Sequence, residues 1–283
     1  TSIVWPIMAI SELIDMTSRG RASLKRISAL LDAPQDVADR PDVRPLGEVR
    51  GDVEFRHLTF RYPDGEYDAL RDVSFSIRAG ENIGLVGRTG SGKTTVVDLI
   101  LRTCNVPDGS LFIDGHDVNT VPIRDVRRAA AYVPQDNFLF SDTIARNIDF
   151  THNSPDQNRV VFAAGLSDVD RDVRNFPLGY DTVLGERGVT VSGGQKQRIS
   201  IARALIKDAP ILILERAILD NLKSTRQGRT TILIAHRIST VERMDRIIFL
   251  EDGTVTAVGA HQELYDNCPA YHRMVELQKL EEE

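Results

Sequence analysis

A run of small and basic residues from Gly87 to Thr94 has the composition and spacing needed to bind phosphate. Its sequence, GRTGSGKT, fits the phosphate-binding loop pattern G-x-x-x-x-G-K-[ST]. Glycines let the backbone curve so that several N–H groups point at one anion, and the positive end of the following helix faces the same point. In such a loop Lys93 reaches the β- and γ-phosphates, and the Thr94 hydroxyl holds Mg²⁺. The run therefore predicts a nucleoside triphosphate site.

The residues on either side of this loop predict the elements that must position it. Residues 82–86 (NIGLV) predict a short buried strand, and residues 95–101 predict an apolar helix. A glycine-rich turn that carries a lysine by chance would lack this order of strand, loop and helix, so we favour the nucleotide site. We expect nucleotide contacts from the whole run, namely Gly87, Arg88, Thr89, Gly90, Ser91, Gly92, Lys93, Thr94 and Thr95.

A second anion site is predicted at residues 191–198 (VSGGQKQR), which open a helix. Ser192 offers a hydroxyl, and the small residues Gly193 and Gly194 leave the first backbone N–H groups of the helix accessible to an anion. A γ-phosphate needs donors on more than one side as charge develops on it. We therefore interpret the second site as a lid for the same nucleotide.

The two motifs together resemble those of ATP-binding cassette (ABC) proteins, from about residue 51 to the C-terminus. Tyr62 matches the aromatic residue that stacks on adenine. Gln135 matches the glutamine that senses Mg²⁺ and the membrane domain, and His236 matches the switch histidine at the γ-phosphate. Each could instead be a strand-end aromatic, a loop amide or a structural histidine, but the sequence around each favours the functional interpretation. Val191, where leucine is usual in the family, is a conservative departure.

The resemblance implies two cofactors, ATP and Mg²⁺, with Thr94 and Gln135 at the metal. It also implies a second cassette as partner, in a homodimer or a heterodimer, paired head to tail. Lys93 and His236 would then serve one nucleotide, with His236 and Gln135 as catalytic residues. The residues expected to close over the partner's nucleotide are Ser192, Gly193, Gly194 and Gln195.

The order of predicted elements indicates an α/β fold, and the resemblance to ABC proteins implies a P-loop NTPase of ABC type. Short alternating segments between residues 53 and 77 predict an antiparallel β subdomain. Apolar strands at 211–214, 230–235 and 246–250 predict a mixed sheet core. Helical patterns predict an inserted subdomain over about residues 136–203. We expect the whole nucleotide-binding domain to span residues 51–283.

The first 50 residues have a different character. Residues 1–31 combine a short apolar stretch around Trp5 with a basic amphipathic helix, as at the cytoplasmic end of a transmembrane helix, although an N-terminal helix packed on its own domain explains the pattern equally well. Residues 32–50 are rich in proline and lack periodicity, which predicts a linker. The first interpretation implies a fused or associated membrane domain and a place at the cytoplasmic face of the cell membrane.

The composition limits the partners of the protein. The 283 residues have a net charge of −6, so there is no electrostatic reason to expect nucleic acid. The two cysteines have neither metal-ligand spacing nor a disulfide framework.

One segment departs from the ABC pattern. After the strand at 211–214 the family carries a metal-binding Asp and a water-orienting Glu, but here Glu215 follows and opens a helix-like stretch. About eleven residues are absent relative to the family, either by a true deletion or because a loop is missing at this junction. We favour the missing loop, because both flanks keep their expected character. If Leu214 is joined directly to Glu215, this carboxylate could reach the metal, but Arg216 could not act as a base.

These features predict the ATP-binding and ATP-hydrolysing subunit of an ABC exporter. A second hypothesis is a regulatory cassette that binds ATP, hydrolyses it poorly and pairs with an active partner. A third is a soluble ABC protein that acts on DNA or ribosomes, which the acidic charge and the apolar N-terminal stretch disfavour.

Overall fold

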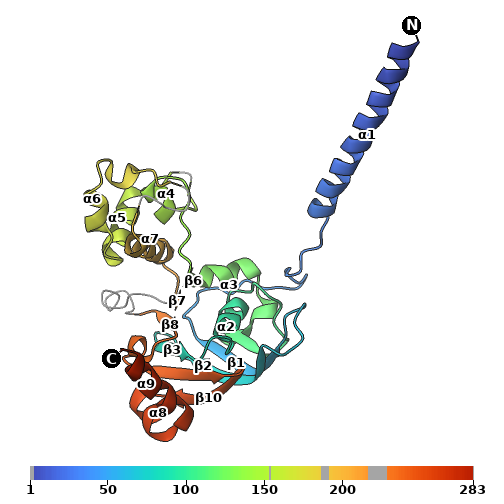
Figure 1. The fold of residues 1–283 in the computed structure, drawn as a ribbon. Helices are drawn as coiled ribbons and strands as arrows, with labels where there is room; N and C mark the ends of the chain where they lie inside the picture. Colours follow the sequence, from blue (N-terminus) through green and yellow to red (C-terminus); the bar gives the residue numbers. More distant parts are fainter. Residues whose placement is uncertain (1–2, 153, 186–190, 216–227, 283) are drawn as a thin grey trace. The chain divides into compact units, whose positions relative to one another are not determined.

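The computed structural model describes residues 3–152, 154–185, 191–215 and 228–282. Within the chain, Thr1–Ala38 and Asp39–Glu283 form two compact units. The first contains the helix α1 (Val4–Leu31), 28 residues long and without a buried side chain (Figure 1). Among the residues that the structure describes, no helix combines the length and the apolar character needed to cross a membrane.

The core of the second unit is a mixed sheet. Its strands lie in the order β10 (Thr254–Gly259), β9 (Arg246–Glu251), β3 (Asn82–Val86), β8 (Thr230–Ala235), β7 (Ile211–Glu215) and β6 (Ala130–Val133). All neighbouring pairs are parallel except β10 with β9. The carboxyl ends of β3, β6, β7 and β8 therefore lie along one edge of the sheet, where parallel α/β sheets bind their ligands.

Helices cover both faces of this sheet. Alternate residues of each strand point to opposite sides, so each strand packs against helices on both faces. Ile211 and Ile213 pack in one buried cluster with α2 (Lys93–Ile100) and α3 (Ile123–Ala129). Leu212 and Leu214 pack in a second cluster with α8 (His261–Asn267) and α9 (Pro269–Glu282). Burial on both faces explains why these strands are continuously apolar.

A second sheet is antiparallel and follows the order β2 (Leu70–Ile77), β1 (Val53–Phe60), β4 (Leu111–Ile113) and β5 (His116–Asp117). The first part of the range in which the sequence predicted short alternating segments forms one continuous strand, β1. The pairing of β1 with β2 is irregular between Phe55 and Leu58, where His57 has a φ of 45°. The interruption is therefore a bulge rather than a strand end.

The helices α4 (Ile144–Ile148), α5 (Gln157–Leu166), α6 (Asp170–Arg174) and α7 (Gly193–Leu205) share an apolar cluster of their own (Figure 1). The mixed sheet, the antiparallel sheet and these inserted helices confirm the predicted fold class. Asp156 caps α5, since its carboxylate accepts hydrogen bonds from the first N–H groups of the helix.

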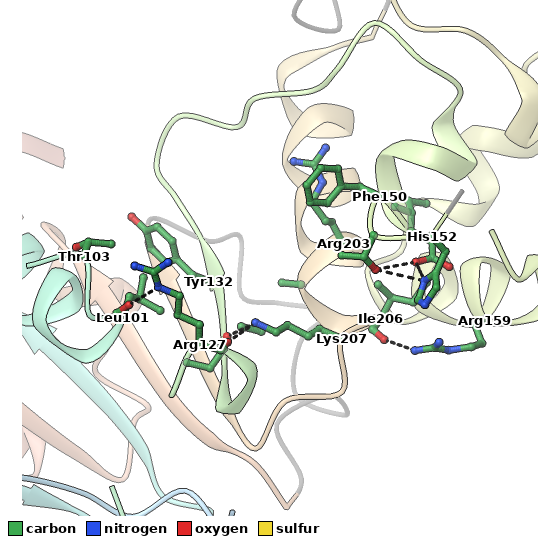
Figure 2. Close-up of a pocket in the computed structure, with 16 residues that line it drawn as sticks. Leu101, Thr103, Arg127, Tyr132, Phe150, His152, Arg159, Arg203, Ile206 and Lys207 are labelled. Carbon is green, nitrogen blue, oxygen red and sulfur yellow. Dashed lines mark hydrogen bonds and ion pairs between the residues drawn. The ribbon is translucent and has the colours of Figure 1, made fainter. Parts of the chain in front are cut away.

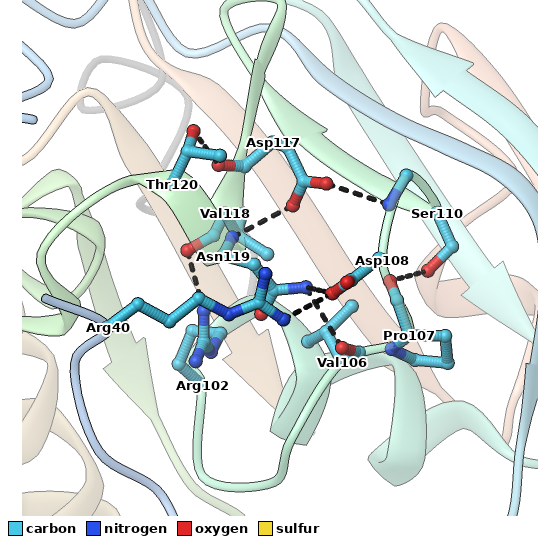
Figure 3. A network of polar contacts seen from close by, with 11 residues as sticks. Arg40, Arg102, Val106, Pro107, Asp108, Ser110, Asp117, Val118, Asn119 and Thr120 are labelled. Atoms are coloured by element: carbon cyan, nitrogen blue, oxygen red, sulfur yellow. Dashed lines mark hydrogen bonds and ion pairs between the residues drawn. The ribbon is translucent and has the colours of Figure 1, made fainter. Parts of the chain in front are cut away.

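Residues 39–50 have no regular helix or strand but pack on the body of the second unit. Asp39 accepts a hydrogen bond from the backbone N–H of Ile123, and Leu46 is buried in the cluster that contains α2. Figure 3 shows Arg40 paired with Asp108, which also accepts from the Asn119 amide. This segment is thus fastened beside the short helix η1 (Val118–Thr120).

The expectation that Glu215 opens a helix is wrong. Glu215 is the last residue of β7 and pairs with Ile234 of β8, while Leu214 pairs with Val133 of β6. The parallel register thus extends one residue further than the apolar pattern indicated. Residues 216–227, which carry the rest of that expected helix, lie outside the described residues.

Candidate nucleotide site

The phosphate loop connects β3 to α2, and its glycines occupy positions that other residues cannot. Gly90 and Gly92 have φ values of 82° and 99°, and Gly92 is the residue that caps α2. A Cβ at Gly87 would lie 2.2 Å from the carbonyl oxygen of Leu250 in β9. The backbone of the loop is therefore left-handed at Gly90 and Gly92, and it packs directly against β9 at Gly87. Both features fix the curvature of the loop.

Lys93 lies at the centre of this loop. Its Nζ donates to the carbonyl oxygens of Gly87 and Arg88 at 2.8 Å, and lies 3.3 Å from the Ser91 hydroxyl. The side chain is buried, which lowers the pKa of Lys93, and the charge of Glu215 partly opposes this shift. The ammonium group is thus held at the inner side of the loop by the loop's own oxygens.

Tyr62 follows β1 and lies against the helix that the phosphate loop opens. Its hydroxyl is 3.1 Å from both the Thr95 hydroxyl and the Asp98 carboxylate. Its ring contacts Phe60 edge to face, with the ring centroids 5.0 Å apart. Burial raises the pKa of Tyr62. The structure therefore brings the predicted adenine contact and the phosphate loop together on α2.

Thr94 and Gln135 meet at the carboxylate of Glu215. Thr94 Oγ1 lies 3.5 Å from Glu215 Oε1, and the backbone N–H of Gln135 points to Glu215 Oε2 at 3.4 Å. The hydroxyl of Tyr132, from β6, donates to the same Oε2 at 2.7 Å. The sequence analysis placed Glu215 at the metal only if Leu214 is joined directly to it, and the strand edge shared by β6, β7 and β8 brings its carboxylate to this position.

His236 directly follows β8 at the same edge of the sheet, and it is exposed. Gln278 of α9 donates to the carbonyl oxygen of His236 and accepts from the N–H of Ile238 at 2.8 Å. The amide of Gln278 thus fixes the backbone on both sides of Arg237. No local sequence signal pointed to Gln278, because it lies 42 residues further along the chain.

The second predicted anion site is the first turn of α7. Ser192 caps this helix: its hydroxyl accepts from the N–H of Gln195, and the Gln195 side chain accepts in return from the N–H of Ser192 at 3.0 Å. Gln195 therefore stabilises the helix end through its side chain. Ser192 and Gly193 are exposed, and a Cβ at Gly193 would meet no atom within 4 Å. This helix end has room for a ligand or a second chain.

A pocket of about 650 Å³ lies beside the site, between β6 and the inserted helices (Figure 2). Four Arg and Lys side chains line it, and each donates to backbone carbonyls: Arg127 to Leu101 and Arg102, Arg159 to Ile206, Arg203 to Phe138 and Asn147, and Lys207 to Arg127 and Ala130. Within the lining that the structure describes, Asp149 is the single acidic residue. The pocket is therefore mostly apolar, with an excess of positive charge.

Comparison with known proteins agrees with this geometry. Residues 70–218 match the family model described as ABC transporter. A probable multidrug resistance ABC transporter ATP-binding/permease protein of Bacillus subtilis is 39% identical, over 98% of this chain and 49% of its own length. The ATP-dependent lipid A-core flippase of Escherichia coli K12 is 36% identical over the same shares.

A solved structure is also similar. A bacterial Atm1-family ABC exporter with ATP bound aligns with a TM-score of 0.86 and 34% identity, over 92% of this chain and 47% of that one. The chain thus spans about half the length of the relatives that it matches.

Proposed function

The chain belongs to the ABC transporter family, and we propose on that premise that it forms the ATP-binding and ATP-hydrolysing subunit of an exporter. The observation that carries the proposal is the shared sheet edge, where the phosphate loop, Gln135 and His236 follow β3, β6 and β8 and Glu215 ends β7. A complete phosphate loop at this edge supports binding of the ATP triphosphate.

Within this proposal, Lys93 binds the β- and γ-phosphates and Tyr62 stacks on adenine. Thr94 contributes its hydroxyl to the Mg²⁺ site, and this hydroxyl lies 3.5 Å from a carboxylate oxygen of Glu215. Gln135 contributes its side-chain amide, while its backbone N–H, directed at the same carboxylate, holds it at this edge of the sheet. Magnesium would neutralise charge on the phosphates during transfer. His236 contacts the γ-phosphate from the end of β8.

We further propose that two cassettes pair head to tail around ATP. The exposed N-terminus of α7 supports this arrangement, because its free N–H groups and the positive end of the helix dipole suit an anion carried by another chain. The comparisons give no specific support to a heterodimer with a regulatory cassette.

The second partner that we propose for this chain is a membrane domain. The name of the Bacillus subtilis relative joins ATP binding to a permease, which supports a fused membrane domain, a cytoplasmic position of this chain and α1 as the end of the last membrane helix. The pocket beside β6 is a suitable docking place, because it is apolar with excess positive charge. The coding sequence upstream of Thr1 tests this: it should encode several transmembrane helices.

Replacing His236 by alanine should lower ATP turnover by about 100-fold or more, because a donor aimed at the transferring phosphate acts mainly in the transition state. ATP affinity should change less than about threefold, since Lys93 and the loop N–H groups provide ground-state binding. Phosphate release and equilibrium ATP binding measure the two quantities. His116→Ala, an exposed histidine of the antiparallel sheet, is the matched control. Unchanged turnover in His236→Ala would instead favour the regulatory cassette.

A further inference from the structure

The backbone after β8 stays extended beyond the last residue of the strand. Arg237 has φ and ψ values of −103° and 132°, although β8 ends at Ala235. In extended backbone the carbonyl of residue 236 and the N–H of residue 238 point to the same side, where a single residue of a parallel neighbouring strand would pair with both. Here one side chain takes that place: the Gln278 amide donates to the His236 carbonyl and accepts from the Ile238 N–H at 2.8 Å.

The helix α9 holds this amide in position. Tyr271, Met274 and Val275 are buried, and the ring of Tyr271 packs edge to face on an aromatic ring of β9, with the centroids 5.5 Å apart. Positions 271, 274, 275 and 278 have the spacing of one helix face, so Gln278 continues the buried face of α9. Met274 and Val275 also share an apolar cluster with Ile238. The amide therefore extends from a packed helix that already contacts the segment it binds.

The backbone of His236 is thus fixed from both sides. Ala235, the residue before it, pairs with Val86 of β3, and the Gln278 amide binds the groups on either side of the residue after it. A side chain that acts on a transferring phosphate must keep its position closely, since a misplacement of about 1 Å can cost about 100-fold in rate. Loss of the Gln278 bonds should therefore affect turnover more than binding.

We propose that Gln278 is a positioning residue for ATP turnover, which acts through His236 by fixing the backbone that carries the imidazole. The C-terminal helix α9 is thereby linked to the nucleotide site, 42 residues away in sequence. The inference rests on the proposed function and deepens it by one residue outside the motifs that indicated the site.

The test compares Gln278→Met with the unaltered 283-residue chain. Methionine keeps the length and the packing of the side chain and removes both hydrogen bonds. The kcat for ATP hydrolysis should fall about tenfold, while KM and the equilibrium affinity for ATP stay within threefold, because the phosphate loop is unchanged. Amide hydrogen exchange at Ile238 should become at least tenfold faster, since this N–H donates to Gln278. Gln262→Met is the matched control, because the Gln262 amide donates within α8 to Asp266, and it should leave all these quantities unchanged.

A double variant separates positioning of His236 from a general effect on the fold. In a chain that already carries His236→Ala, adding Gln278→Met should lower turnover less than twofold further, because no imidazole remains to be positioned. A further tenfold loss in that background would overturn the proposal, as would normal turnover in Gln278→Met or unchanged exchange at Ile238. Each of these results would leave the proposed ATP site intact. Absence of ATP hydrolysis by the unaltered chain would instead remove the proposed function, and the inference with it.

Discussion

Lys93→Met is expected to lower the affinity for ATP by about 100-fold. Lysine contributes charge-assisted hydrogen bonds to the phosphates, each worth about 1.5–3 kcal/mol, and about 1.4 kcal/mol corresponds to a factor of ten in affinity. Methionine preserves most of the buried apolar stem of this side chain. The lost affinity therefore reports the ammonium group rather than a collapsed loop.

Thermal unfolding distinguishes loss of the ammonium group from loss of the folded loop. The free energy of unfolding should change little in Lys93→Met, because the cost of leaving the carbonyls of Gly87 and Arg88 unpaired is offset by relief from burying a cation. Lys25→Met, at an exposed position of α1, should leave ATP binding unchanged. Calorimetric titration with ATP provides the affinities. Equal affinities of Lys93→Met and the unaltered chain would contradict the assignment of the phosphate loop.

Gly193→Glu is expected to abolish ATP-driven pairing of two chains while leaving each folded chain at least as stable as before. The first turn of α7 has room for the side chain, since a Cβ there meets no atom within 4 Å. Gly193 is the first residue of α7, where a carboxylate near the positive end of the helix dipole is favourable by about 0.3–1 kcal/mol. In the proposed dimer the same carboxylate would face the γ-phosphate of the partner's ATP and repel it.

Gly193→Glu should prevent pairing of two chains without lowering the stability of each chain, so unfolding would not explain the loss of the dimer. Affinity of the single chain for ATP should be unaltered, because its own phosphate loop is unchanged, whereas the dimer should not form. Gly165→Glu, another helical glycine with open space around it, is the matched control and should pair normally. Dimers of Gly193→Glu at the same ATP concentration would show that α7 does not close over a nucleotide.

Features encoded by neighbouring residues were predictable from the sequence. The phosphate loop, the capped start of α7 and the apolar strands each depend on residues within a few positions of one another, so their patterns indicated the fold class and most of the candidate residues. His236 was also recognisable, because it directly follows an apolar strand.

Features that depend on the register between distant strands were not predictable in this way. Glu215 resembled the start of a helix because the residues after it have helical composition, but pairing with β8 extends the strand through it. Gln278 and the Arg40–Asp108 pair join segments far apart in sequence. Single-sequence patterns carry no information about such contacts, which depend on how the whole sheet assembles.

Separate assignment of Thr94 and Gln135 to the metal is a similar case. The sequence suggested both residues, and it placed Glu215 beside them only if Leu214 is joined directly to it. The structure places Glu215 between the two, with Tyr132 as a further partner of its carboxylate. The candidate site is therefore more complete than the motif residues alone indicated.

The molar mass of the purified chain in solution, with and without ATP and Mg²⁺, tests the central claim most directly. The account predicts 31.5 kDa for the chain without nucleotide and twice that mass with saturating ATP, because two chains enclose ATP between the phosphate loop of one and α7 of the other. A chain that has bound ATP to saturation and still has the mass of a single copy would contradict the shared site.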